Sequence, residues 1–196
     1  MNRKWKGLGT LVTVFALLLT VAIQAGPCLA GEKDDDKEEG GGYVRFEDER
    51  PMGEVQPDKA LVYVVRPAMV GFAIKSFFLC DDEILGINKG HSYFFSQVAP
   101  GKHVFWSKSE NVDALELEVS AGKTYYIQQH VQMGGFRART KLEVLGEAEG
   151  KTALDKCKKH AVMTAQGIEK GKEIARDHRK DTQEDLDRRA RKDKKE

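Results

Sequence analysis

The sequence lacks an excess of charge of either sign. Lysine and arginine number 32 and aspartate and glutamate 31, so the formal net charge is +1 although charged residues make up 32% of the chain. Nucleic-acid-binding domains usually carry a marked basic excess on one face. The charge balance therefore argues against a nucleic-acid partner.

The common motifs of catalysis and metal binding are also missing. The chain has no Cys-x-x-Cys, no two histidines four residues apart, no Gly-x-Ser-x-Gly elbow and no glycine-rich loop leading into a lysine and a helix. Asp81, Asp82 and Glu83 are adjacent on one expected turn, whereas the carboxyl pair of a glycosidase faces across the scissile bond with about 5 Å or more between its members. We expect no catalytic residue, no metal, no cofactor and hence no enzyme.

Long apolar runs are absent except near the start of the chain. Leu8–Ile23 is largely apolar, but its 16 residues fall short of the roughly 18 needed to span a membrane. Arg3, Lys4 and Lys6 precede this run, and small residues suited to a cleavage site occupy positions 28 and 30. The pattern is typical of a secretory signal peptide over residues 1–30, which predicts an exported protein.

Cysteine is scarce, with three residues in the chain. Cys28 is a candidate lipidation site that would tether the protein to a membrane, although Pro27 precedes it where lipidation signals carry a small residue. Cleavage after Ala30 would leave Cys80 and Cys157, an even number that permits a disulfide between the C-terminal helix and the sheet. Two unpaired apolar thiols are the alternative, because the sequence carries no geometry to test the span.

The composition divides the remainder of the chain into four segments. Residues 31–57 are acidic and glycine-rich, which predicts a linker, because such a segment cannot bury enough apolar surface to fold. Residues 58–146 predict a β-sandwich and residues 150–175 an amphipathic helix. Residues 176–196 have almost no apolar side chains and predict a charged tail, either a frayed helix or disordered.

Short strands separated by turn signals fill the expected sandwich. Ala60–Arg66 is a continuous apolar run, as in a strand buried on both faces. The other strands are expected at residues 72–80, 84–88, 92–98, 102–108, 114–120, 123–133 and 136–145. About eight mostly antiparallel strands at this spacing, with no helix between them, favour an all-β sandwich.

Gly134-Gly135 predicts a two-residue hairpin turn between the last two strands. Met133 would then pair with Phe136, and apolar and polar side chains would separate onto opposite faces. The polar face carries Gln128, His130, Gln132, Arg137, Arg139 and Lys141. Guanidinium groups suit carboxylates and phosphates, so this face is a candidate surface for an anionic or sugar polymer. The alternative is a solvated face whose charges prevent edge pairing.

After Leu145 the spacing of apolar residues changes to that of a helix. An apolar stripe is formed by Leu154, Cys157, Ala161, Ala165 and Ile168. Thr152–Asp155 resembles a capping box that opens this helix. Gly167 and Gly171 are expected to weaken it further along.

Five stretches within residues 59–145 resemble a known bacterial family. They are ALVYVVRPAMVG at 60–71, FFLCDDEILG at 77–86, SYFFSQVAPGKHVFW at 92–106, AGKTYYIQQHVQMG at 121–134 and ARTKLEVL at 138–145. These stretches are similar to the extracytoplasmic family known as domain of unknown function 2846. The resemblance implies a prealbumin-like sandwich in an exported, often membrane-anchored protein of the periplasm or outer envelope, and it implies no activity.

The sequence therefore predicts a non-catalytic binding or interaction module of the bacterial envelope. Its expected partner is another envelope protein or an anionic or sugar polymer. Two alternatives come from other classes. One is an envelope enzyme acting on glycans or peptides, and the other is a lipoprotein assembly factor that holds a membrane complex through its charged tail.

Overall fold

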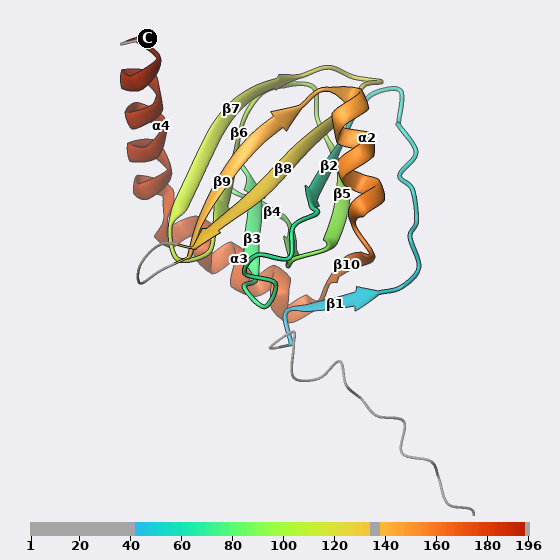
Figure 1. Cartoon of the computed structure of the whole chain (residues 1–196). Coiled ribbons are helices and arrows are strands. Elements are labelled where there is room, and N and C mark those ends of the chain that lie inside the picture. The colour runs from blue at the N-terminus through green and yellow to red at the C-terminus, as the bar shows by residue number, and fades with distance from the viewer. Residues whose placement is uncertain (1–41, 134–137, 195–196) are drawn as a thin grey trace, which may run out of the picture. The chain divides into compact units, whose positions relative to one another are not determined.

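Two β-sheets pack face to face in this protein (Figure 1). The computed structural model describes residues 42–133 and 138–194, which lie in one compact unit. Sheet A has the strand order β1-β10-β5-β2-β8-β9 and sheet B the order β4-β3-β6-β7. The strands are β1 (Val44–Glu47), β2 (Ala60–Arg66), β3 (Ser76–Cys80), β4 (Glu83–Asn88), β5 (Ser92–Val98), β6 (Gly101–Lys108), β7 (Val112–Val119), β8 (Thr124–Met133), β9 (Ala138–Leu145) and β10 (Lys159–Met163).

Strand β2 is the centre of sheet A, and every one of its residues is buried. It pairs antiparallel with β5 and parallel with β8. Alternate side chains enter two different cores, because successive residues of a strand point to opposite faces. Ala60, Val62 and Val64 enter the core between the sheets. Leu61, Tyr63 and Val65 enter a second core on the outer face of sheet A.

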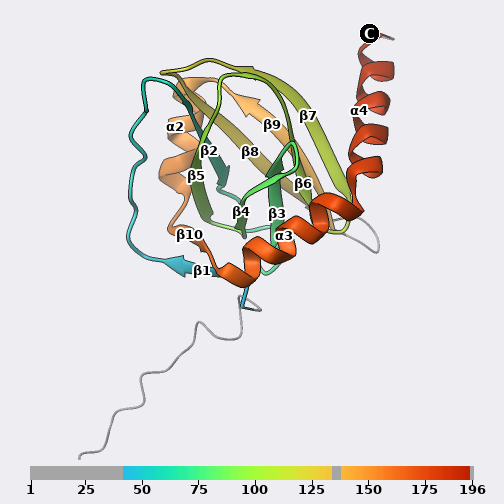
Figure 2. The same ribbon diagram turned by 180° about the vertical axis from the view of Figure 1, so that it is seen from behind.

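Helix α2 (Glu147–Lys156) covers part of that outer face, where Ala153 and Leu154 pack into the second core. Helix α3 (Ala165–Asp177) lies on the outer side of sheet B, with Ile174 and Ala175 packed against Trp106. Helix α4 (Arg179–Asp193) follows it along β7. Figure 2 shows α3 crossing sheet B and α4 beside its edge.

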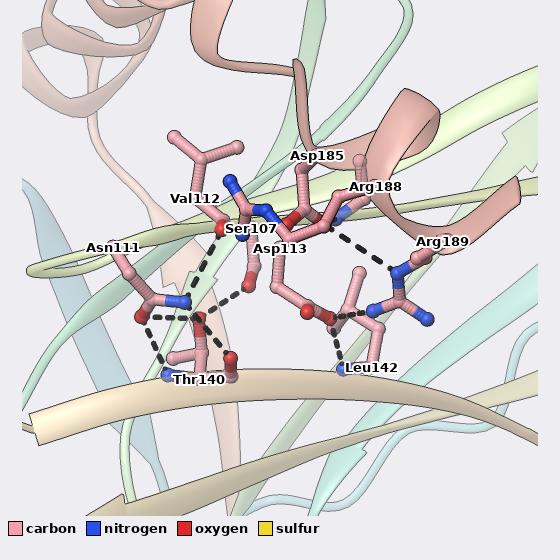
Figure 3. A network of polar contacts seen from close by, with 10 residues as sticks. Ser107, Asn111, Val112, Asp113, Thr140, Leu142, Asp185, Arg188 and Arg189 are labelled. Atoms are coloured by element: carbon pink, nitrogen blue, oxygen red, sulfur yellow. Dashed lines mark hydrogen bonds and ion pairs between the residues drawn. The ribbon is translucent and has the colours of Figure 1, made fainter. Parts of the chain in front are cut away.

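Side chains, in place of backbone ladder bonds, join the edges of the two sheets at β7 and β9 (Figure 3). Asn111 Oδ1 accepts a hydrogen bond from the Thr140 N–H (2.7 Å), and its Nδ2 donates to the Thr140 carbonyl (3.1 Å). Asp113 Oδ2 accepts from the Leu142 N–H at 2.6 Å. Asn111 and Asp113 therefore hydrogen-bond to backbone groups of the edge strand β9. Those groups would otherwise be free to pair with another chain.

Helix α4 is fastened to the same edge. Arg189 pairs with the Asp113 carboxylate, and Asp185 accepts a hydrogen bond from the Ala114 N–H at 3.1 Å. Burial raises the pKa of the Asp113 carboxyl, although the Leu142 N–H and Arg189 both act to lower it. Over its described part, the expected charged tail is a helix and not a disordered segment, and it is docked along β7 although most of its side chains are exposed.

The all-β sandwich is confirmed, and most strand positions agree with the sequence prediction. β2 and β5 have the expected bounds. β3 begins at Ser76, not at Phe72, because the chain after β2 first forms a loop over residues 67–75. No local pattern predicted the two parallel pairs, β2 with β8 and β10 with β5.

The register of the last hairpin is corrected by two residues. Met133 pairs with Ala138, and His130 lies opposite Lys141, not opposite Arg139. The expected turn at Gly134-Gly135 lies outside the described residues. Because side chains alternate with a period of two, a shift of two residues leaves each side chain on its predicted face. The division into a buried and an exposed face therefore survives the change of partners.

Two strands lie where the sequence predicted none. β1 falls inside the expected linker and pairs antiparallel with β10. β10 interrupts the expected single helix at 150–175, which is in fact α2, a strand and α3. The expected capping box at Thr152–Asp155 is also wrong, because α2 begins at Glu147 and the Thr152 hydroxyl donates to Ala148 within the helix.

The two glycines of α3 serve close packing. A Cβ at Gly167 would lie 2.1 Å from the Tyr43 carbonyl oxygen, and one at Gly171 would lie 2.6 Å from Ile84. Both glycines stand four residues apart on one face of the helix, so they let α3 approach β1 and β4. Thr164 is the N-cap of the helix, and its hydroxyl accepts a hydrogen bond from the Gly167 N–H.

Replacing Asn111 by alanine tests the side-chain link between the sheets. The change removes both partners of the Thr140 peptide groups, and we expect the free energy of unfolding to fall by about 1–3 kcal/mol. Urea unfolding followed by circular dichroism measures it. Glu118→Ala, at an exposed position of β7, is the matched control and should change stability by less than about 0.5 kcal/mol. Equal midpoints for the two variants would contradict the assignment.

Candidate functional site

The outer face of β8 and β9 is only partly covered by a helix. Helix α2 presses on it at Tyr126, where a Cβ on Gly150 would lie 2.1 Å from the ring. Beyond that point the face is open to solvent, as the uncovered length of β9 shows in Figure 1. The exposed side chains there are Gln132, Arg139, Lys141 and Glu143.

A chain of three hydrogen-bonded side chains runs across this face. Gln128 Nε2 lies 3.3 Å from His130 Nδ1, and His130 Nε2 lies 2.8 Å from Glu143 Oε2. The Gln128 amide and the Glu143 carboxylate thus contact opposite nitrogens of the ring and hold the imidazole in one orientation.

Five of the six residues predicted for the ligand face lie together on this surface. They are Gln128, His130, Gln132, Arg139 and Lys141. Arg137 lies outside the described residues. The prediction left out Glu143, although strand alternation places it on the same face, opposite Gln128. The surface therefore combines two cations, one carboxylate and several neutral donors.

A second cluster joins Cys80, Asp81 and His103 at the turn between β3 and β4. Their donor atoms lie within 4.8 Å of one another, the separation that a metal ion would require. His103 Nδ1 lies 2.7 Å from Asp81 Oδ2, and its Nε2 lies 2.9 Å from the Ala99 carbonyl. Both ring nitrogens thus face hydrogen-bond acceptors of the protein, which hold the ring in place beside the turn.

The cysteine in this cluster is a poor ligand. Burial, with the charges of Asp81 and Glu83, raises the pKa of the Cys80 thiol to about 12, whereas metals bind the thiolate. Asp81 instead clamps the turn to β6, because its side chain accepts from the Val104 N–H and its carbonyl accepts from the Trp106 indole. The cluster fits a structural role better than a metal site.

Of the two readings of Cys80 and Cys157, the structure shows the unpaired thiols and not the disulfide. Both thiols are free and buried. Cys80 lies in the core between the sheets, and Cys157 lies in the core beneath α2 on the other side of sheet A. Burial raises the pKa of the Cys157 thiol to about 11. Lipidation at Cys28 concerns a residue outside the described part of the chain and stays a prediction.

Two pockets lie beside α3, away from the β8–β9 face. One has a volume of about 220 Å³ and is lined by Asp82, Arg179 and Trp106 among others. The other, of about 320 Å³, lies between α3 and the turn at Lys108–Glu110. Neither includes a residue of the polar β8–β9 face. Within residues 42–133 and 138–194, no helix has the length and apolar character needed to cross a membrane.

The reactivity of the cysteines tests the unpaired state of the thiols. Each pH unit below its pKa lowers the thiolate fraction of a thiol tenfold. At pH 8, Cys80 and Cys157 should therefore resist an aromatic disulfide reagent in the native protein, whereas both should react in urea. The intact mass of a chain that begins at Gly31 should not change on reduction. An increase of two hydrogens would instead establish the disulfide.

Part of the chain is similar to other proteins. A protein of Haemophilus influenzae described as "Uncharacterized protein" is 32% identical over 97 residues, which cover 48% of this chain and 57% of that protein. The chain thus spans little more than half the length of its curated relative. No solved structure shows a significant match. A family model described as "Protein of unknown function (DUF2846)" matches residues 56–141. The segment from the turn before β2 to the middle of β9 is therefore similar to the DUF2846 family.

Proposed function

We propose that the chain is an exported protein of the bacterial envelope whose sandwich acts as a non-catalytic binding module for an anionic or sugar polymer. One observation carries the proposal: a sheet face left open beside α2 displays Arg139 and Lys141 next to an imidazole held in one orientation by Gln128 and Glu143. Both cations are exposed, so a ligand can reach them without any rearrangement of the sheet.

The shape of the face favours a polymer over a small molecule. Small ligands usually occupy concave pockets, whereas this surface is the outer face of two neighbouring strands of sheet A. Side chains on one face of a strand repeat about every 6.5–7 Å, and neighbouring strands lie about 4.8 Å apart. Such a grid of donors suits a chain of repeating units that bear carboxylates, phosphates or hydroxyl groups. Arg139 can bind a carboxylate or phosphate through two parallel hydrogen bonds.

Export rests on the sequence of residues 1–30, with a basic start, a short apolar run and a small-residue cleavage site. The alternative of an assembly factor is less well supported. Its charged tail would have to reach a partner, whereas Arg189 and Asp185 bind α4 along β7.

Removing the two cations tests the binding face. Arg139→Ala with Lys141→Ala should lower the retention of the protein on an immobilised polyuronate or purified cell-wall glycan at least tenfold, because hydrogen bonds to charged groups contribute about 1.5–3 kcal/mol each. The double variant Lys102→Ala with Lys123→Ala changes the net charge equally at exposed positions off this face and should bind as the parent does. Unchanged retention of the first variant would refute the binding role.

The mass of the protein purified from native bacterial envelope tests export separately. A mature chain that starts at Gly31 is the expected result. A chain that starts at Cys28 and carries acyl groups would make it a membrane-tethered lipoprotein, still exported. A chain that retains residues 1–30 would contradict export and leave the binding experiment unaffected.

A further inference from the structure

The core between the two sheets changes from apolar to polar at one end. Six strands carry a buried apolar residue on the inner face and, two positions nearer this end, a buried polar one. The apolar residues are Val64, Phe78, Phe94, Phe105, Ile127 and Leu142. The polar residues are Arg66, Ser76, Ser92, Ser107, Gln129 and Thr140, each between 0% and 3% exposed. Side chains of these polar types usually lie at the surface, because their burial costs free energy unless a partner is present.

Strand pairing brings these polar side chains together. Arg66 lies directly opposite Ser92 in β5, and the parallel register of β2 with β8 places Gln129 beside it. In sheet B, Ser76 of β3 lies directly opposite Asn88 of β4, which is also fully buried. Residues directly opposite each other point to the same face of a sheet, so Asn88 belongs to the same inner layer.

Arg66 joins the two sheets at this end. Its Nη1 donates to the Ile74 carbonyl at 2.5 Å and its Nη2 to the Gly71 carbonyl at 2.6 Å, both in the loop that leads into β3. Burial lowers the pKa of its guanidinium to about 10, and no carboxylate of the described residues opposes this shift. Buried arginines are usually paired with an acidic group. The layer therefore contains a positive charge whose partners in the loop are neutral carbonyls.

Several buried polar atoms of this layer have no hydrogen-bond partner among residues 42–133 and 138–194. They are Arg66 Nε, Ser76 Oγ, both amide atoms of Asn88 and both amide atoms of Gln129. Other members of the layer are satisfied, since the Ser107 hydroxyl donates to Thr140 Oγ1 at 2.9 Å. Buried polar atoms of native proteins are nearly always hydrogen-bonded to the protein or to a molecule held inside it. The unpartnered group therefore indicates a place where an internal molecule binds.

The unpartnered atoms define the chemistry of that molecule. Arg66 Nε and the two amide nitrogens donate hydrogen bonds, the two amide oxygens accept them, and Ser76 Oγ does either. The buried charge of Arg66 favours an anion over water, because water would leave that charge uncompensated. The amide oxygens require a donor on the same molecule. An ammonium group would place a second positive charge in the layer, so a hydroxyl group is the donor that fits.

We propose that Arg66, Ser76, Asn88 and Gln129 form an internal site that binds a small carboxylate carrying a hydroxyl group. Arg66 Nε and an amide nitrogen donate to the carboxylate, and the hydroxyl group of the ligand donates to an amide oxygen. Facing sheets lie about 10 Å apart, so the space between these side chains admits only a small molecule. The internal site thus differs in ligand size from the open polymer face.

The loop over residues 67–75 separates the internal site from solvent. A Cβ on Gly71 would lie 2.8 Å from the Val131 side chain and 3.4 Å from Arg66 Nη2, so the loop backbone sits directly against β8 and the guanidinium. Three apolar side chains of the loop are more than half exposed, namely Met69, Val70 and Phe72. Segments with few buried apolar contacts open locally at low free-energy cost. The ligand enters by local opening of this loop.

This inference goes beyond the proposed polymer binding and uses the opposite side of β8. Gln129 lies on the inner face, directly opposite Leu142 of the core between the sheets, whereas the polymer face is the outer one. The two proposals can therefore fail independently. The Arg139→Ala, Lys141→Ala variant should bind the small carboxylate as the parent does, and a Gln129→Leu variant should retain polymer binding.

Three probes at constant ionic strength test the ligand class. They are glycolate, acetate, which lacks the hydroxyl group, and ethylene glycol, which lacks the carboxylate. Glycolate should raise the thermal unfolding midpoint of the chain from Gly31 in a saturable way, because it binds only the folded state. Acetate should bind at least tenfold more weakly, because it leaves buried amide oxygens unpaired, and ethylene glycol should have no effect. Absence of a glycolate effect, or equal binding of glycolate and acetate, would overturn the proposal.

Replacing Gln129 by leucine separates a binding role from a structural one. Glycolate affinity should fall at least tenfold, whereas the midpoint without glycolate should be unchanged or higher, because an apolar side chain replaces a buried amide that has no protein partner. Ser76→Ala is a second variant and should weaken glycolate binding several-fold. Gln56→Leu, at an exposed position, is the matched control and should bind as the parent does. A lower midpoint of Gln129→Leu with unchanged glycolate affinity would contradict the assignment.

A crystal structure of the protein grown with glycolate locates the ligand directly. Glycolate between the sheets, with its carboxylate at Arg66 Nε and its hydroxyl group at the amide of Asn88 or Gln129, is the expected result. Ordered water only at these side chains would refute the proposal and assign the polar layer to internal hydration. Glycolate bound only at Arg139 and Lys141 would likewise refute it.

Discussion

The arrangement of the whole sandwich depends on one constraint, which is that both faces of β2 are buried. Its seven residues are all buried, so both sides of the strand must be covered. Sheet B covers the inner side. The outer side is covered by α2 and by the segment before β2, where the Gly53 N–H donates to the Tyr63 hydroxyl and the Pro51 carbonyl accepts from Tyr93. The helix and this covering segment are therefore consequences of an apolar central strand, and the polar face of β8 and β9 is open where that cover ends.

Arg66 ends the apolar run of β2 and changes what the chain can do next. A guanidinium placed after six apolar residues has to be hydrogen-bonded inside the fold, since an unpaired buried charge is very costly. The following loop supplies its carbonyls for that purpose and leaves its apolar side chains without a core to enter.

A related arrangement holds at the edge formed by β7 and β9, where Asn111 and Asp113 use side-chain groups to complete the hydrogen bonds of β9.

Alternation and turn chemistry predicted the sandwich, most of its strands and the separation of the hairpin faces. Those features depend on local sequence, which is why the two faces survived a register shift of two residues. The pairing of β2 with β8 could not be predicted, because no local signal joins segments about sixty residues apart. The strand β10 could not be predicted either, because the five residues Lys159–Met163 fit a short strand as well as part of a helical stripe. In the candidate site, strand alternation placed Glu143 on the polar face, but only the structure shows its hydrogen bond to His130.

The placement of β1 has a mechanical consequence. β1 is one of the two edge strands of sheet A, and its hydrogen-bonded neighbour in the sheet is β10, a strand from much later in the chain. Tension applied from a tethered N-terminus would enter at β1 and reach β10 first. It would next load the contacts of Arg50 with Leu154 and of Gly53 with Tyr63, and only then β2. The pairing of β1 with β10 and the contacts of Arg50 and Gly53 would therefore break before force reaches β2. The sandwich would remain folded while the segment before β2 extends.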